Sequence, residues 1–238
     1  MKQLGLCTFF LFFLIHVSSA FCAAPIFHVY IAEKWLEDFE AYGEIEKQNF
    51  IVGTLFPDIR YLGELRREET HEIGIGITDI LETTDPFRKG MRLHVFVDET
   101  RARILKELGI MNLLGDVPDD HKVTFLKFLE DAVLYSSGNW DHIRQYLGSF
   151  VPDPKFDYKV PNSSLNRWHG ILENYFKHGP TKLLARLSAS DQGYLGVPPH
   201  LIKQWAVLIP ELSQAQFVQK YVSDLISGFA CLSQPEPM

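Results

Sequence analysis

Apolar residues recur at helical spacing along almost the whole chain. In residues 27–42, for example, Ile31, Trp35 and Phe39 fall on one face of a helix. A stripe with this period buries one side of a helix against a core. Neither the alternating pattern of a strand nor an internal repeat is found. The 238 residues are therefore predicted to form one all-α, multi-helix domain.

Start and stop residues divide this pattern into separate helices. Asp85 is a suitable N-cap, Pro86 a suitable first residue and Gly109 a stop. Ser163 or Ser164 is expected to cap the helix that Gly179 and Pro180 end. Loops are predicted near 60–84, 112–120 and 150–162. The predicted helices are 27–42, 44–56, 85–109, 122–137, 139–150, 163–179, 181–188, 198–209 and 213–232.

The first 20 residues have the pattern of a secretory signal peptide. Lys2 precedes an apolar run over residues 4–17, and small residues at 18–20 suit cleavage after Ala20. An uncleaved anchor is the alternative, but the run is shorter than the ~20 residues that a membrane span needs. We therefore expect an exported protein, periplasmic or extracellular, with a domain over 25–232 and a frayed tail over 233–238.

The remaining composition excludes some classes of protein. Without the signal peptide, only Cys22 and Cys231 remain, which is too few for a disulfide framework. The net charge of −7 argues against stable binding to nucleic acid. Nothing in the sequence indicates a protein partner.

Two predicted helices carry a histidine and a carboxylate on a face that should be core. His94 and Asp98 are four residues apart in a segment that is apolar on almost every side. His169 and Glu173 repeat this spacing within an apolar stripe. Inward-facing imidazoles and carboxylates are how helical bundles build metal sites. A histidine held in the core by hydrogen bonds is the alternative for each pair.

Three further residues have both a structural and a ligand interpretation. His28 lies in an apolar context near the start of the domain, and His71 follows a highly charged loop. Asp58 ends the apolar run "FIVGTLFPD", where a carboxylate either terminates a helix or binds a metal.

Taken in order, these positions resemble the zinc-dependent phospholipase C family. Its superfamily includes the single-strand-specific zinc nucleases. The resemblance covers roughly residues 25–176. The residues that carry it are His28, the Phe-x-x-Gly-x-x-x-Pro-Asp segment from Phe50 to Asp58, His71, His94-x-x-x-Asp98 and His169-x-x-x-Glu173.

The resemblance implies a secreted all-α fold that binds one to three zinc ions in a cleft between helices. One zinc would be held by Asp58, His71, His94 and Asp98. A second would be held by His28, with Asp98 bridging and with backbone groups of the mature N-terminus. A third would be held by His169, Glu173 and one more histidine. The family places that histidine soon after the His-x-x-x-Asp pair, where this chain has none, so His121 and His142 are the candidates and His142 is the better one.

The expected function is hydrolysis of a phosphodiester by metal-activated water. For a phospholipid the products are diacylglycerol and a phosphorylated head group, and the plentiful aromatic residues suit transient contact with a membrane surface. Asp58 is the candidate to orient or deprotonate the water. The alternatives are a single-strand nuclease or phosphatase of the same fold, and a non-catalytic, exported, metal-binding helical domain.

Overall fold

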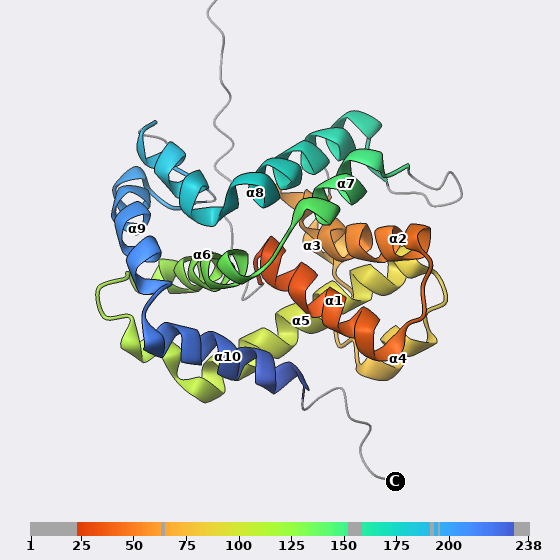
Figure 1. Ribbon diagram of the computed structural model, residues 1–238, viewed down its shortest axis with the longest axis horizontal. Helices are drawn as coiled ribbons and strands as arrows, with labels where there is room; N and C mark the ends of the chain where they lie inside the picture. Colours follow the sequence, from red (N-terminus) through yellow and green to blue (C-terminus); the bar gives the residue numbers. More distant parts are fainter. Residues whose placement is uncertain (1–22, 63–64, 152–158, 191–192, 195, 231–238) are drawn as a thin grey trace, which may run out of the picture.

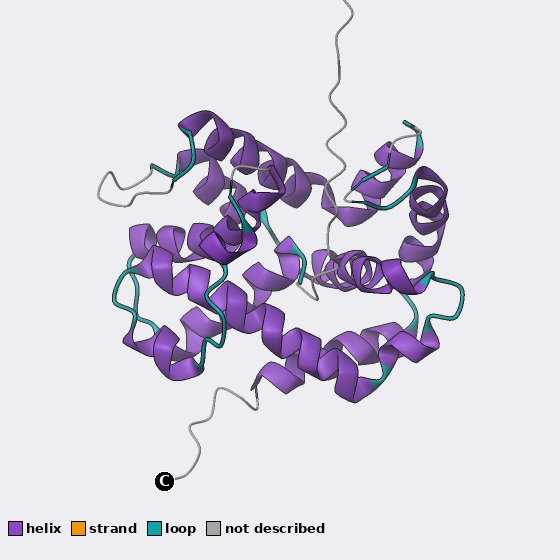
Figure 2. Ribbon diagram, turned by 180° about the vertical axis from the view of Figure 1, so that it is seen from behind, coloured by secondary structure: helices purple, strands orange, loops and turns teal. Residues whose placement is uncertain are grey.

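The computed structural model describes residues 23–62, 65–151, 159–190, 193–194 and 196–230. These residues form helices joined by loops, and no strand longer than the single bridge between Tyr194 and Val197 is found among them (Figure 2). The prediction of an all-α fold is therefore confirmed.

The described part of the chain contains both α-helices and 3-10 helices. The α-helices are α1 Pro25–Phe39, α2 Glu44–Leu55, α3 Arg67–Thr70, α4 Ile77–Glu82, α5 Pro86–Leu108, α6 Asp119–Ser137, α7 Asp141–Ser149, α8 Asn162–Ser188, α9 Pro199–Leu212 and α10 Gln216–Ala230. The 3-10 helices are η1 Phe56–Leu62 and η2 Ile110–Leu113.

The helices α1 and α5 cross in the middle of the molecule (Figure 1). The helix α8 runs along one edge and α10 along the opposite edge, while α9 closes one side. Contacts of α1 with α2, α5 and α6 place its apolar face in the common core. The start of α1 is thereby held near the centre of the fold.

Several predicted boundaries are found in the structure. Asp85 caps α5 by accepting a hydrogen bond from the Arg88 N–H at 2.7 Å. Gly109 ends α5 with a left-handed φ of 62°. Gly179, with φ of 72°, introduces a kink into α8 at the point where a helix end was predicted. Glycine suits both places because other residues adopt positive φ only at a cost.

Other boundaries differ from the prediction. Helix α2 ends at Leu55, one residue before its predicted end, and the chain continues into η1, which contains the buried Asp58. The predicted loop over 60–84 contains the short helices α3 and α4. Helix α8 begins at Asn162 after Pro161, so the expected serine cap is wrong. Pro161 has no cap side chain, but its carbonyl still accepts the first helical N–H groups.

Some predictions fall outside the described residues. They are the signal peptide with its cleavage after Ala20, the last two residues of the expected domain and the tail over 233–238. Within the described part of the chain, every helix is too short or too polar to cross a membrane.

Two glycines allow a close approach between the α2 and α5 backbones. A Cβ atom added to Gly53 on α2 would lie 2.1 Å from the backbone oxygen of Phe87 on α5, and one added to Gly90 would lie 2.1 Å from the oxygen of Phe50. Such distances are far inside van der Waals contact, so the two backbones can meet only where both side chains are absent. This crossing fixes the register of α2 against α5.

Replacing Gly53 by alanine should therefore destabilise the fold by about 3 kcal/mol or more, because the methyl group must push two backbones apart. The matched control is Gly170→Ala on α8, where an added Cβ meets nothing within 4 Å. That change should be neutral or stabilising by up to ~1 kcal/mol through helix propensity. Urea unfolding followed by circular dichroism measures both. A Gly53→Ala protein as stable as the wild type would contradict the tight crossing.

Candidate metal centre

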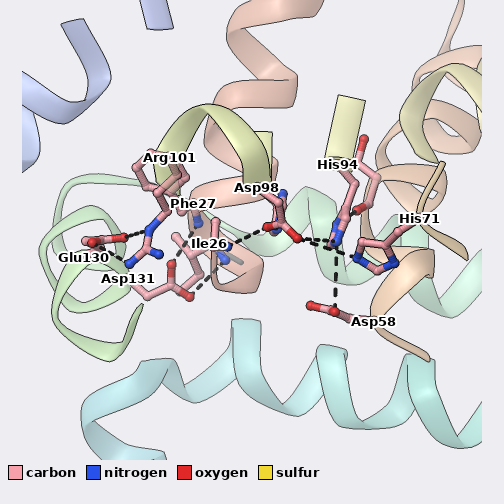
Figure 3. Close-up of polar contacts among 12 residues, drawn as sticks. Ile26, Phe27, Asp58, His71, His94, Asp98, Arg101, Glu130 and Asp131 are labelled. Atoms are coloured by element: carbon pink, nitrogen blue, oxygen red, sulfur yellow. Dashed lines mark hydrogen bonds and ion pairs between the residues drawn. The ribbon is translucent and has the colours of Figure 1, made fainter. Parts of the chain in front are cut away.

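Five side chains from four parts of the chain converge beside this crossing. His28 comes from α1, Asp58 from η1, His71 from the end of α3, and His94 and Asp98 from successive turns of α5. None of them is more than 7% exposed. Figure 3 shows Asp98 and His94 on α5 facing His71 and Asp58. The sequence predicted each of these five as a ligand, and the structure brings them together.

Asp98 lies at the centre of the cluster. Its Oδ1 is 3.2 Å from His28 Nε2, and its Oδ2 is 3.5 Å from His94 Nε2 and 3.6 Å from His71 Nε2. The two carboxylate oxygens thus face different histidines. A carboxylate in this position can bridge two cations.

The ligand atoms form two overlapping groups. Those of His28, Asp58 and His94 lie within 4.8 Å of one another, and so do those of His71, His94 and Asp98. The rings of His28 and His94 stack with centroids 3.9 Å apart. Three imidazoles and two carboxylates at these separations form a set of donors that could hold a metal ion.

A hydrogen bond fixes the tautomer of His94. Its Nδ1 is 2.9 Å from the carbonyl oxygen of Thr54, which can only accept, so Nδ1 carries the proton. The Nε2 lone pair then points into the cluster. Burial lowers the pKa of His94 well below its usual value, with the neighbouring His28 acting in the same direction. His94 is therefore neutral at pH 7, the form that binds metals.

His71 is oriented in the same way through Thr70. The Thr70 hydroxyl donates to the carbonyl oxygen of Arg67 at 3.2 Å and therefore accepts from His71 Nδ1 at 2.8 Å. His71 Nε2 is left free to face Asp98. Nothing in the sequence indicated the two threonine contacts, because one acceptor is the backbone carbonyl of Thr54 and the other is the Thr70 hydroxyl, and neither belongs to a motif.

Several buried atoms in the cluster have no hydrogen-bond partner among the described residues. They are both ring nitrogens of His28, Asp58 Oδ1, His71 Nε2, His94 Nε2 and Asp98 Oδ2. A buried polar atom without a hydrogen bond costs about 1–3 kcal/mol, so six such atoms at one place need an explanation. A cation bound among them would satisfy these atoms, and the donor set fits one.

The three residues predicted for a further site do not join this cluster. His169 packs on Phe150 and is hydrogen-bonded to the backbone of Leu147, and burial lowers its pKa to about 4. It therefore has the features of a neutral core histidine, which was the alternative to a ligand. His142 instead pairs with Glu33. Within the described part of the chain, neither of these residues nor Glu173 belongs to a potential metal-binding group.

The start of α1 is tied to the cluster by carboxylates. The Ala23 N–H donates to Asp98 Oδ1 at 2.7 Å. The N–H groups of Ile26 and Phe27 donate to Asp131 on α6 at 3.0 and 2.8 Å (Figure 3). Since α1 has no side-chain cap of its own, Asp131 performs that task from another helix. His28 is held in place by this arrangement.

A second buried carboxylate, Glu130, supports the same region. Arg101, one turn beyond Asp98 on α5, binds Glu130 through Nε at 2.7 Å and Nη2 at 2.8 Å. The Tyr221 hydroxyl of α10 also donates to Glu130. Sequence reasoning missed these supports. The detectable signal was an adjacent pair of acids inside the apolar run "FLEDAVL".

Comparisons with known proteins add no relative. Models of known families, curated protein sequences and solved structures were each searched, and none matches this chain. The likeness to zinc-dependent phospholipases C therefore rests on the residues described above.

Metal binding can be tested directly through stability. Zn²⁺ at a hundred times its dissociation constant should stabilise the wild type by about 2.7 kcal/mol, because it binds the folded cluster only. His94→Ala should abolish most of this gain, since His94 belongs to both groups of ligands. His169→Ala, matched in residue type, should keep it. Thermal unfolding with and without the metal measures the shift, and an equal loss in both variants would contradict the assignment.

Asp131 should make stability depend on pH. Burial raises its pKa to about 7, although three hydrogen bonds oppose this. Between about pH 4 and 7 the unfolded chain releases this proton and the folded one keeps it, so stability falls as the pH rises and levels off above 7. Relative to Asp131→Asn, the metal-free wild type should lose roughly 4 kcal/mol over this range.

The measurement is urea unfolding at several pH values, with Asp224→Asn on the surface of α10 as the control. Parallel curves for the wild type and Asp131→Asn would show that Asp131 titrates normally, contrary to this account.

Proposed function

We propose that the protein is a zinc-dependent hydrolase of phosphoric diesters, of the phospholipase C type. The observation that carries the proposal is the convergence of three histidines and two aspartates with buried ligand atoms that lack hydrogen-bond partners among the described residues. Imidazole and carboxylate ligands suit Zn²⁺, and an incomplete protein ligand set leaves room for water or substrate. The order of these residues along the chain supports the same conclusion.

The residues of this chain would share the work as follows. His71, His94, Asp58 and Asp98 would hold one zinc ion, and His28 with Asp98 would hold another. Zinc bound there supplies positive charge that lowers the pKa of a water molecule and polarises a phosphoryl oxygen. Thr54 and Thr70 keep the His94 and His71 rings oriented and in the ligating tautomer.

Asp58 stands at the boundary between this cluster and a pocket. It lines a cavity of about 230 Å³ whose other walls come from η1, α6, α8 and the residues before α1. Its Oδ1 has no hydrogen-bond partner among the described residues, with Arg60 Nη2 at 3.5 Å. This carboxylate is suited to orient the attacking water and take its proton. The water oxygen adds to phosphorus, the phosphorus–oxygen bond to the alcohol breaks, and the proton passes to the departing alkoxide.

The walls of the pocket favour an apolar alcohol as the leaving group. Phe128, Trp168 and Leu172 line it together with several tyrosines. A pocket with apolar walls and one carboxylate at its metal end suits an ester that carries hydrocarbon next to its phosphate. A phospholipid has this arrangement, and its products would be diacylglycerol and the phosphorylated head group.

The test is release of diacylglycerol from phosphatidylcholine vesicles by the zinc-loaded protein. Asp58→Asn should reduce kcat by roughly 10²–10⁴, because the amide can neither accept the proton nor carry the charge. Asp224→Asn, a surface change on α10, should leave kcat unaltered. Hydrolysis of single-stranded DNA in place of lipid would contradict the substrate class. Bound zinc without hydrolysis of any phosphoric ester would overturn the enzymatic proposal.

A further inference from the structure

The pocket beside Asp58 contains one lysine, Lys127 of α6. Among the described residues that line it, the charged side chains are those of Asp58 and Lys127, and the rest are aromatic, aliphatic or hydroxyl-bearing. Lys127 is half-buried there. Asp58 of the metal cluster and the cationic side chain of Lys127 therefore line the same pocket from different elements.

The position of Lys127 follows from the anchoring of α1. Asp131 on α6 faces the start of α1, where it binds the N–H groups of Ile26 and Phe27. Lys127 precedes Asp131 by four residues and lies on the same face of the helix, one turn earlier. It therefore faces the segment before α1, and Ala23 and Ala24 of that segment also line the pocket.

Lys127 has no hydrogen bond or ion pair with any residue in the described ranges, unlike Lys122 one and a half turns earlier, which pairs with Asp119. A half-buried ammonium group in a pocket lined by Phe128 and Trp168 loses part of its hydration without forming an ion pair with a described residue. Such a group is stabilised by an anion that enters the pocket. The apolar walls leave the anion few other polar contacts.

We propose that Lys127 binds a non-bridging oxygen of the substrate phosphate, on the side of the pocket away from the metal ligands. This inference rests on the proposed function. Lys127 would also supply the positive charge that was expected from the third predicted zinc ion. His169 and Glu173, the predicted ligands of that ion, do not assemble with the cluster. A lysine can neutralise charge that develops on a phosphoryl group in the transition state, as a metal ion does.

The test uses zinc-loaded protein and inorganic phosphate as the probe, with binding measured by calorimetry. Lys127→Met should weaken phosphate binding at least tenfold, and Lys127→Arg should restore it to within a few-fold. Lys122→Met on the same helix is the matched control and should bind phosphate as the wild type does. Zinc content should be equal in all four proteins.

The thermal midpoint of unfolding distinguishes an anion-binding role of Lys127 from a structural one. Lys127→Met should leave the thermal midpoint of the phosphate-free protein unchanged or raise it, because an unpaired half-buried charge is removed. A lowered midpoint, or phosphate affinity equal to that of the wild type, would overturn the proposal.

The same variants distinguish this inference from the proposed function. If the wild type hydrolyses no phosphoric ester but the tenfold difference in phosphate affinity is found, the hydrolase proposal fails and the anion site stands. If lipid hydrolysis is found and Lys127→Met retains the wild-type kcat/KM and phosphate affinity, the anion site fails and the hydrolase stands.

Discussion

The contact between Gly53 and Gly90 is the constraint on which the rest of the site depends. With the α2 and α5 backbones touching, the carbonyl of Thr54 reaches the His94 ring, and the end of α2 delivers Asp58 through η1 to the same place. Larger residues at this crossing would separate the helices and break the hydrogen bond that sets the His94 tautomer. The two glycines therefore allow both the close packing of α2 on α5 and the hydrogen bond that sets the His94 tautomer.

The cluster is costly for the protein without a cation. Three imidazoles and two carboxylates are buried with ligand atoms that lack hydrogen-bond partners in the described ranges, and the start of α1 depends on the buried Asp131. Residues that serve stability alone would not leave these atoms unsatisfied. The buried Arg101–Glu130 pair and the Asp131 cap offset the cost by holding α1, α5 and α6 together around the cluster. Rigid supports of this kind keep ligands in place before a metal or a substrate arrives.

The helices could be predicted from the sequence more fully than the contacts of the candidate ligands could. The period of the apolar residues sufficed for α5, whose cap and stop residues act locally, and it placed His94 and Asp98 on one face. His169 and Glu173 have the same spacing, yet His169 is held by the Leu147 backbone, because spacing within one helix does not say which neighbour the face meets. The roles of Thr54, Asp131 and Lys127 depend on contacts between distant segments, such as that between Ile26 and Asp131, which are 105 positions apart. A local pattern such as "FLEDAVL" can mark a buried acid, but it does not say which distant segment that acid contacts.

The central claim is that histidine and aspartate side chains of the α1, η1, α3 and α5 segments bind zinc. X-ray absorption at the zinc edge of protein loaded with one equivalent of metal tests it most directly. The account predicts nitrogen and oxygen ligands at about 2.0–2.2 Å, the outer-shell scattering of at least two imidazoles, and loss of that scattering on His94→Ala. Zinc surrounded by oxygen alone, or a spectrum that His94→Ala leaves unchanged, would contradict it.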